Sequence, residues 1–181
     1  MKKPLLYLAI LLFSTGAFAD QDDPRLEDLF KQLKRAESPI AAAPIEELIW
    51  QIWMEHADSS IEGMMQLGIQ QMNAGDASAA LATFDRLVEA APDFAEAWNK
   101  RATIHYLLGN NAASEADIVK TLQLEPYHFG ALSGRGLVLI AQGKFEEARN
   151  AFSRALEVHP NMTAVKNNID QINAYLSRRT I

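Results

Sequence analysis

The stretch GKFEEARNAFSRALEVHP, residues 143–160, has the pattern of one amphipathic helix that begins after a glycine and ends at a proline. Glycines and prolines recur at intervals of 34 residues at the two ends of this pattern: Gly75, Gly109 and Gly143, and Pro92, Pro126 and Pro160. The helix is therefore one copy of a repeat.

The repeat frame divides the chain into three copies, 61–94, 95–128 and 129–162. They share a small residue at position 8, another at position 20 and a bulky one at position 24: Gly68, Ala102 and Gly136; Ala80, Ser114 and Ala148; Phe84, Ile118 and Phe152. We expect positions 8 and 20 to face each other, so that two antiparallel helices approach closely. A leucine at either place should overpack the pair by roughly 1 to 3 kcal/mol. The glycine at position 15 can take the positive φ that ends a helix, and the proline at position 32 cannot continue one.

This pattern resembles the tetratricopeptide repeat, which has an early Trp, a Leu-Gly step, a Tyr, and then Ala, Phe, Ala and Pro. The matching residues are Trp98, Leu67, Gly68, Ala148, Phe152, Ala155 and Pro160. The middle copy departs from the pattern at Arg101, Ala102, His105 and Thr121. The resemblance implies an all-α fold, a right-handed superhelical solenoid of antiparallel helix pairs, and a function in binding.

The last repeat of such a solenoid needs a cover for its apolar face. Residues 163–178 place Val165, Ile169, Ile172 and Leu176 on one stripe at helical spacing, opposite polar residues. We therefore expect residues 163–181 to form a capping helix with a short basic tail.

Residues 20–60 have the pattern of a less regular helical pair. Asp23 and Pro24 suit the N-cap and first turn of a helix, and an Ala/Pro-rich connection, AESPIAAAP, leads to a second helix rich in Ile and Trp. Extending the repeat frame backwards gives Trp50 an apolar position, which favours a divergent further repeat. However, Trp53 then falls at a small-residue position, and a separate hairpin that is docked differently explains the same stripes.

Residues 1–19 have the composition of a signal peptide, with a basic start, an apolar run and the sequence Ala17-Phe18-Ala19 at the end. We expect cleavage after Ala19, because the apolar run is about half of the roughly 20 residues that a membrane anchor needs. The mature chain would carry a net charge of −8, from 15 basic and 23 acidic residues, so nucleic acid is not an expected partner. The sequence has no cysteine, and we expect a periplasmic protein, with secretion as the alternative.

No motif in the sequence indicates catalysis. The histidines lack the i, i+4 spacing of a metal site: His56, His105, His128 and His159. We therefore expect no enzymatic activity, no metal and no cofactor. An enzyme with its site between the N-terminal pair and the solenoid is a remaining alternative. It would need clustered ionisable groups there, where the sequence supplies mostly Leu, Ile and Trp.

The family resemblance implies that the first helix of each repeat faces a concave groove. The candidate groove residues at the matching positions are Met65, Ile69, Met72, Asn99, Thr103, Tyr106, Leu107, Leu137 and Ile140. This mostly apolar set predicts binding of an apolar protein or peptide segment by an adaptor or assembly factor of the bacterial envelope. In the alternatives, the N-terminal pair covers the groove, or a homodimer buries either the groove or the face of Trp50 and Trp53.

Family members that clamp a C-terminal carboxylate use Lys, Asn and Arg from three successive first helices. The matching positions here hold Met65, Ile69, Lys100, Gly130 and Gly134, so one cation of that set remains. A carboxylate-terminated peptide is therefore not the expected partner.

Overall fold

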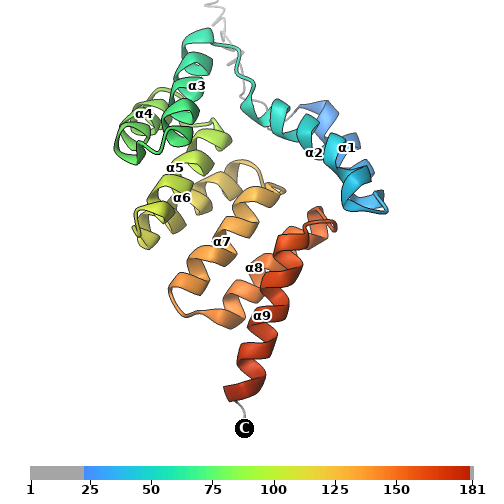
Figure 1. Ribbon diagram of the computed structural model, residues 1–181. Coiled ribbons are helices and arrows are strands. Elements are labelled where there is room, and N and C mark those ends of the chain that lie inside the picture. The colour runs from blue at the N-terminus through green and yellow to red at the C-terminus, as the bar shows by residue number, and fades with distance from the viewer. Residues whose placement is uncertain (1–22, 180–181) are drawn as a thin grey trace, which may run out of the picture.

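The computed structural model describes residues 23–179, and this part of the chain consists of nine helices joined by short turns (Figure 1). The helices are α1 (Pro24–Arg35), α2 (Pro39–Met54), α3 (Ser59–Asn73), α4 (Ala77–Ala90), α5 (Ala95–Leu107), α6 (Asn111–Leu124), α7 (Phe129–Ala141), α8 (Phe145–Val158) and α9 (Thr163–Arg179). Each repeat supplies one antiparallel pair, and each helix from α3 to α9 packs against the next. The all-α solenoid is confirmed, whereas the predicted signal peptide lies outside the described residues.

The three glycines at position 15 end the first helix of each pair as predicted. Gly75, Gly109 and Gly143 have φ angles of 76°, 77° and 75°. In each copy the N–H of the next residue donates to the carbonyl five residues before it, at 2.8 to 3.0 Å: Asp76 to Gln71, Asn110 to His105 and Lys144 to Leu139. These bonds satisfy carbonyl groups that the end of a helix would otherwise leave without a partner.

Gly109→Ala is expected to lower the free energy of unfolding by about 1 kcal/mol, because a residue with a Cβ is strained at this positive φ. Gly63→Ala is the matched control, since an added Cβ meets nothing within 4 Å at either glycine and only Gly109 has a positive φ. Gly63 lies within α3, so its replacement should stabilise the chain by up to about 1 kcal/mol. Urea denaturation of both variants checks the prediction, and equal effects would contradict it.

Within the first and third repeats, the glycine at position 8 lies against the aromatic ring at position 24. A Cβ on Gly68 would lie 2.6 Å from Cζ of Phe84, and one on Gly136 would lie 2.4 Å from Cε1 of Phe152. We expected position 20 as the facing residue, but the bulky ring is nearer, because it fills the space that the missing side chain leaves. Position 20 does approach position 8 in the middle repeat, where the Ser114 hydroxyl donates to the Ala102 carbonyl at 2.8 Å.

The solenoid ends at α3 on its N-terminal side. Positions 3 and 10 of the second and third repeats are buried, and they hold Ala97, Ile104, Ala131 and Val138. The same positions of the first repeat hold Gly63 and Gln70, which are exposed. At the other end α9 packs against α8 and buries Val165 and Ile172, as the apolar stripe predicts.

Helices α1 and α2 form a hairpin that does not continue the stack (Figure 1). Helix α2 packs against α1 and α5 rather than α3. The arrangement therefore matches the separate hairpin better than the divergent further repeat. The connection is also shorter than expected, because Ser38 accepts the N–H of Ala41 as an N-cap and α2 begins at Pro39. Pro44 lies inside the helix and has no N–H to donate to the carbonyl of Ile40, one turn earlier.

Candidate functional site

The candidate groove residues lie on the first helices of the repeats, and most of them keep part of their surface in solvent. Leu107 is the most exposed, at 66%. Thr103 is also exposed, while its hydroxyl donates to the carbonyl of Asn99 at 3.0 Å. The half-buried members pack partly against the solenoid core: Ile69, Met72, Tyr106, Leu137 and Ile140.

Two of the predicted groove residues are not available to a ligand. Met65 is fully buried in the core cluster that α3 and α4 share, so the expectation that it lines an open groove is wrong. Asn99 is 8% exposed, and its amide donates to the carboxylate of Glu96 at 2.9 Å. The remaining apolar set is therefore smaller than predicted and centres on Leu107 and Tyr106 of α5.

The hairpin lies along the row of turns that join consecutive repeats, residues 91–94, 125–128 and 159–162, which we call the turn edge. Its contacts fall at equivalent repeat positions. The ring of His56 lies 5.2 Å from Phe94 at position 34 of the first repeat. Trp53 stacks on His128 at position 34 of the second, with centroids 4.0 Å apart and planes at 10°.

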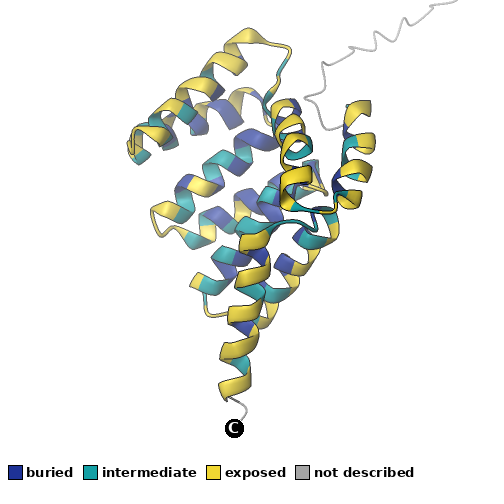
Figure 2. Ribbon diagram, turned by 45° about the vertical axis from the view of Figure 1, so that its right-hand side comes forward, coloured by how far each residue is buried: buried dark blue, intermediate teal, exposed yellow. Residues whose placement is uncertain are grey.

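Polar contacts along the turn edge follow the same register. The Trp53 indole donates to Glu125 at 3.3 Å, and Glu46 lies 3.1 Å from Nε2 of His159, which occupies the same position 31 in the next repeat. At the end of the row, the amide of Asn161 donates to the carbonyl of Ala36 at 2.7 Å. The outer sides of the hairpin helices remain exposed (Figure 2).

A fully buried carboxylate, that of Glu96, lies beneath α2. It accepts a hydrogen bond from Nε2 of His128 at 2.8 Å and forms an ion pair with Nζ of Lys100 at 2.7 Å. Since Nδ1 of His128 accepts the N–H of Ala131 at 3.0 Å, Nε2 must carry the ring proton. Burial raises the pKa of Glu96, but the charge of Lys100 and the hydrogen bond from His128 outweigh it, so the pKa lies below the ordinary 4.5.

The junction of hairpin and solenoid thus gathers ionisable groups that the sequence pattern did not place there. The solenoid, not the hairpin, supplies most of them. The side chains of Glu96 and His128 have no exposed surface, so they cannot meet a substrate. No group of three or more ligands that could hold a metal ion occurs among residues 23–179.

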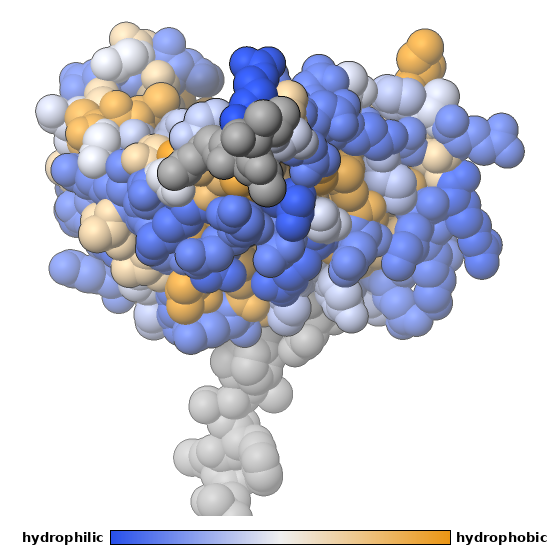
Figure 3. Space-filling view, turned by 90° about the horizontal axis from the view of Figure 1, so that it is seen from below, coloured by the Kyte–Doolittle hydropathy of each residue, from blue (hydrophilic) through white to orange (hydrophobic). Residues whose placement is uncertain are grey.

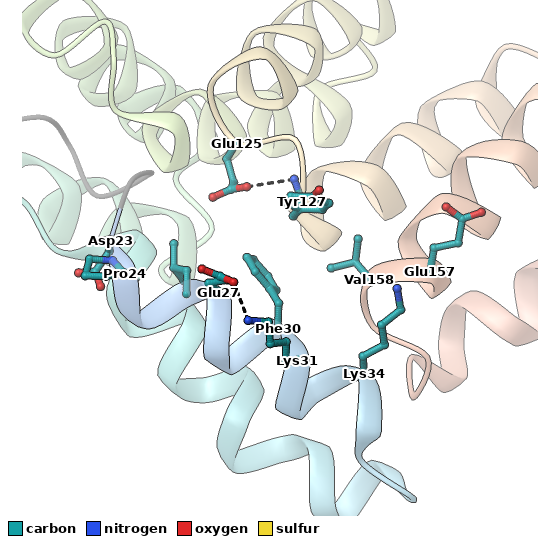
Figure 4. Close-up of a pocket in the computed structure, with 11 residues that line it drawn as sticks. Asp23, Pro24, Glu27, Phe30, Lys31, Lys34, Glu125, Tyr127, Glu157 and Val158 are labelled. Carbon is teal, nitrogen blue, oxygen red and sulfur yellow. Dashed lines mark hydrogen bonds and ion pairs between the residues drawn. The ribbon is translucent and has the colours of Figure 1, made fainter.

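A cavity of about 560 Å³ separates α1 from the turn edge (Figure 4). Phe30 of α1 and Tyr127 line it and contact each other, with ring centroids 5.7 Å apart, and Val158 lines it at the end of α8. Figure 4 shows Lys34 extending from α1 toward the end of α8. The sequence pattern did not indicate this cavity, because its walls come from segments more than 90 residues apart.

On the face seen from the C-terminal end, which is mostly hydrophilic, hydrophobic residues lie in separate small areas (Figure 3). Within the described part of the chain, no helix is both long and apolar enough to cross a membrane. A partner that contacts this protein therefore meets local apolar sites with polar surroundings.

Comparison with known proteins gives consistent results for sequence and fold. Models of the tetratricopeptide repeat match residues 65–127 and 130–162. A TPR repeat-containing protein of Rhizobium etli is 37% identical over 136 residues, which cover 75% of this chain and 67% of that protein.

Two solved structures show the similarity of fold. The first TPR of Spaghetti (RPAP3), bound to the HSP90 peptide SRMEEVD, has a TM-score of 0.64 at 26% identity and covers 67% of this chain and 98% of that one. MamA has a TM-score of 0.63 at 17% identity and covers 97% of this chain and 89% of that one. The match with RPAP3 therefore covers one whole repeat domain of that protein, and the match with MamA covers nearly all of this chain.

Proposed function

The chain belongs to the tetratricopeptide repeat family, and from this premise we propose that it is a non-enzymatic binding module that holds an apolar segment of another protein. Similar repeat domains bind peptides, as the structure of RPAP3 with an HSP90 peptide illustrates. The observation that carries the proposal is the accessible set on the first helices, in which Leu107 exposes 66% of its surface beside Tyr106 and Thr103. The set offers apolar contacts and a hydroxyl, and its own side chains carry no charge.

An acidic C-terminal peptide fits this surface poorly. Lys100 is the one cation at the positions that a carboxylate clamp would use, and it already pairs with Glu96 at 2.7 Å. Its ammonium group also lies 5.2 Å from the ring centroid of Trp50. Binding a second carboxylate would require Lys100 to leave a buried partner, which is costly.

The cell envelope of a bacterium is the proposed place of action. The support is the signal-like sequence of residues 1–19 and the absence of cysteine from the chain. In that setting the protein would act as an adaptor or assembly factor. Detection of the mature chain, beginning at Asp20, in a periplasmic extract checks this part, and recovery of the uncleaved chain from the cytosol would contradict it.

Leu107→Glu is expected to weaken partner binding at least about tenfold, equivalent to about 1.4 kcal/mol, because it places a charge within an apolar contact. Leu67→Glu is the control, since Leu67 is also exposed, at 41%, but lies at the outer end of the solenoid. Both side chains are partly exposed, so both melting temperatures should stay close to that of the unchanged protein.

The partner for this measurement is identified first by photocrosslinking in the bacterium that makes the protein. A photoreactive residue replaces Leu107 in one variant and the exposed Lys166 of α9 in the other. A protein adduct formed at residue 107 alone supports the proposal, and its affinity is then measured by calorimetry with the two glutamate variants. Adducts only with residues 24–54 or with a second copy of the chain would show that the groove is covered.

A further inference from the structure

The turn edge has the properties of a binding surface that is occupied by a segment of its own chain. Among residues 23–179, four buried ionisable side chains lie where the hairpin docks: Glu96, Glu125, His128 and His159. A fifth, that of Asp117, lies elsewhere in the solenoid. A repeat solenoid does not need such groups for stacking, and the first repeat has Ala91 and Phe94 at two of the equivalent positions. Glu125, His128 and His159 contact Trp53, Trp50 or Glu46 of α2, and Glu96 supports this surface from beneath through its hydrogen bond with His128.

Gly130 has no side chain, and the space that this leaves forms a socket for an indole ring. A Cβ there would lie 2.5 Å from Cη2 of Trp50, so any larger residue would displace that ring. The equivalent positions of the other two repeats hold Glu62 and Glu96. Together with the stacking face of His128, the socket accepts two indoles that stand three residues apart on one helix, as Trp50 and Trp53 do.

The solenoid and the hairpin have distinct hydrophobic clusters. The three core clusters within the solenoid consist only of residues numbered 61 or higher. The hairpin has its own cluster, which reaches the solenoid through Phe129, Val158 and Met162. Its covalent connection is the short segment 55–58, and α2 does not pack against α3 to the extent that successive solenoid helices do.

We propose that the turn edge is an exchangeable helix-binding surface, with α2 as its resident occupant. The partner that fits it is a helix of the same chemistry: mostly apolar, with two indole side chains three residues apart and a carboxylate four residues before the first. In α2 these groups are Trp50, Trp53 and Glu46. Aromatic anchors in fitted pockets beside satisfied polar groups are typical of binding sites. The surface extends from the turn edge onto Lys100 of α5 and Gly130 of α7, and it uses different residues from the set around Leu107.

An incoming helix must compete with a resident that is held at a high effective concentration by its linker. The apparent affinity of the unchanged protein is therefore reduced by the small fraction of molecules in which α2 is undocked. Weakening α2 without altering the turn edge should remove that competition and raise the affinity.

The test measures the binding of a fluorescent peptide with the sequence of residues 37–56 to the full mature chain, by anisotropy. Trp53→Ala weakens the resident helix and leaves the turn edge intact, so the peptide should bind at least tenfold more tightly than to the unchanged protein. Adding His128→Ala removes the stacking face and should lower the affinity tenfold again. Adding Leu107→Glu to Trp53→Ala instead should change nothing, which separates this surface from the proposed groove.

Glu46→Ala serves as a second, milder release, because it removes the contact with His159 and the hydrogen bond that Glu46 accepts from Trp50, while both indole side chains remain in the helix. It should raise the affinity for the peptide about threefold and preserve the helical circular dichroism spectrum. Equal binding to the unchanged protein and to both released variants would overturn the proposal. Binding that persists without His128, or no binding to any variant, would overturn it as well.

Discussion

Lys100→Met is expected to lower the free energy of unfolding at pH 7 by about 3 kcal/mol, because it leaves the carboxylate of Glu96 buried without its cation. Lys100 is the nearest positive charge, at 2.7 Å, and the side chain of Glu96 has no exposed surface. The methionine keeps the apolar stem of the lysine, so the loss comes mainly from the charge. The contact of Lys100 with the ring of Trp50 is lost as well.

The pH dependence of this loss gives a sharper test than its size. In the unchanged protein the pKa of Glu96 is below the ordinary 4.5, so its contribution to stability is present above that value and disappears as the pH falls through the folded pKa. Without Lys100, burial dominates and raises the pKa of Glu96. The variant is then penalised as the pH rises, and the difference in stability should grow between pH 4 and pH 7.

Lys31→Met is the matched control, because Lys31 pairs with Glu27 at 2.5 Å in the same i, i+4 arrangement on a fully exposed face. Water screens this pair, so no resolvable change in stability is expected. Urea denaturation followed by tryptophan fluorescence at several pH values measures all three proteins. A loss for Lys100→Met that is the same at pH 4 and pH 7 would show that the charge of Glu96 is not its cause.

Gly136→Ala is expected to lower the free energy of unfolding by about 2 kcal/mol, although alanine normally favours a helix over glycine. The new Cβ would lie 2.4 Å from the ring of Phe152, which is fully buried, so the ring or the helix must shift to accept it. The helix pair of the third repeat must therefore separate or the ring must leave its preferred rotamer.

Gly134→Ala, two residues earlier in the same helix, has the opposite expected sign. Its Cβ would approach no atom more closely than Cδ1 of Ile118, at 3.9 Å, which is an ordinary contact. The gain in helix propensity is up to about 1 kcal/mol, so the melting temperature should rise. Thermal denaturation of the two variants separates packing from propensity, and a loss of stability at both positions would leave the packing explanation without support.

The sequence was sufficient for the parts of the fold that depend on local rules. Gly109 and its equivalents end helices because of their φ angles, and the prolines limit the second helices, so helix order and the repeat frame could be predicted. The middle repeat even compensates in volume, since Ala102 adds a methyl group where Ile118 replaces a phenylalanine. A close reading of the repeats could have found this exchange.

The position of the hairpin could not be predicted from apolar spacing, because α2 is apolar on more than one side. The polar outer face of α3 indicated that no further repeat packs against it. Gln70 occupies the position at which the following repeats have the buried Ile104 and Val138. A second signal was the pair Glu125 and His128 at positions that hold Ala91 and Phe94 in the first repeat.

The candidate groove was predicted only in part, for a related reason. The family frame assigned Met65 to the groove by its position in the helix, but burial depends on the neighbouring helices, and Met65 lies in a hydrophobic cluster with residues of α4 and α5. Met65 therefore belongs to the core, while Leu107 remains accessible. The binding role of the accessible set stays a prediction.

The hairpin also determines the order in which the protein can fold. Its hydrogen bonds to the turn edge join residues 72, 113 and 125 positions apart, whereas side-chain bonds between neighbouring solenoid helices join residues 12 to 24 apart. The solenoid can form repeat by repeat through local contacts, but the hairpin has no complete surface to dock on until residues 159–162 have been made. The hairpin, which precedes the solenoid in the chain, is thus the last element to reach its native place, and its apolar side chains need protection in the interval.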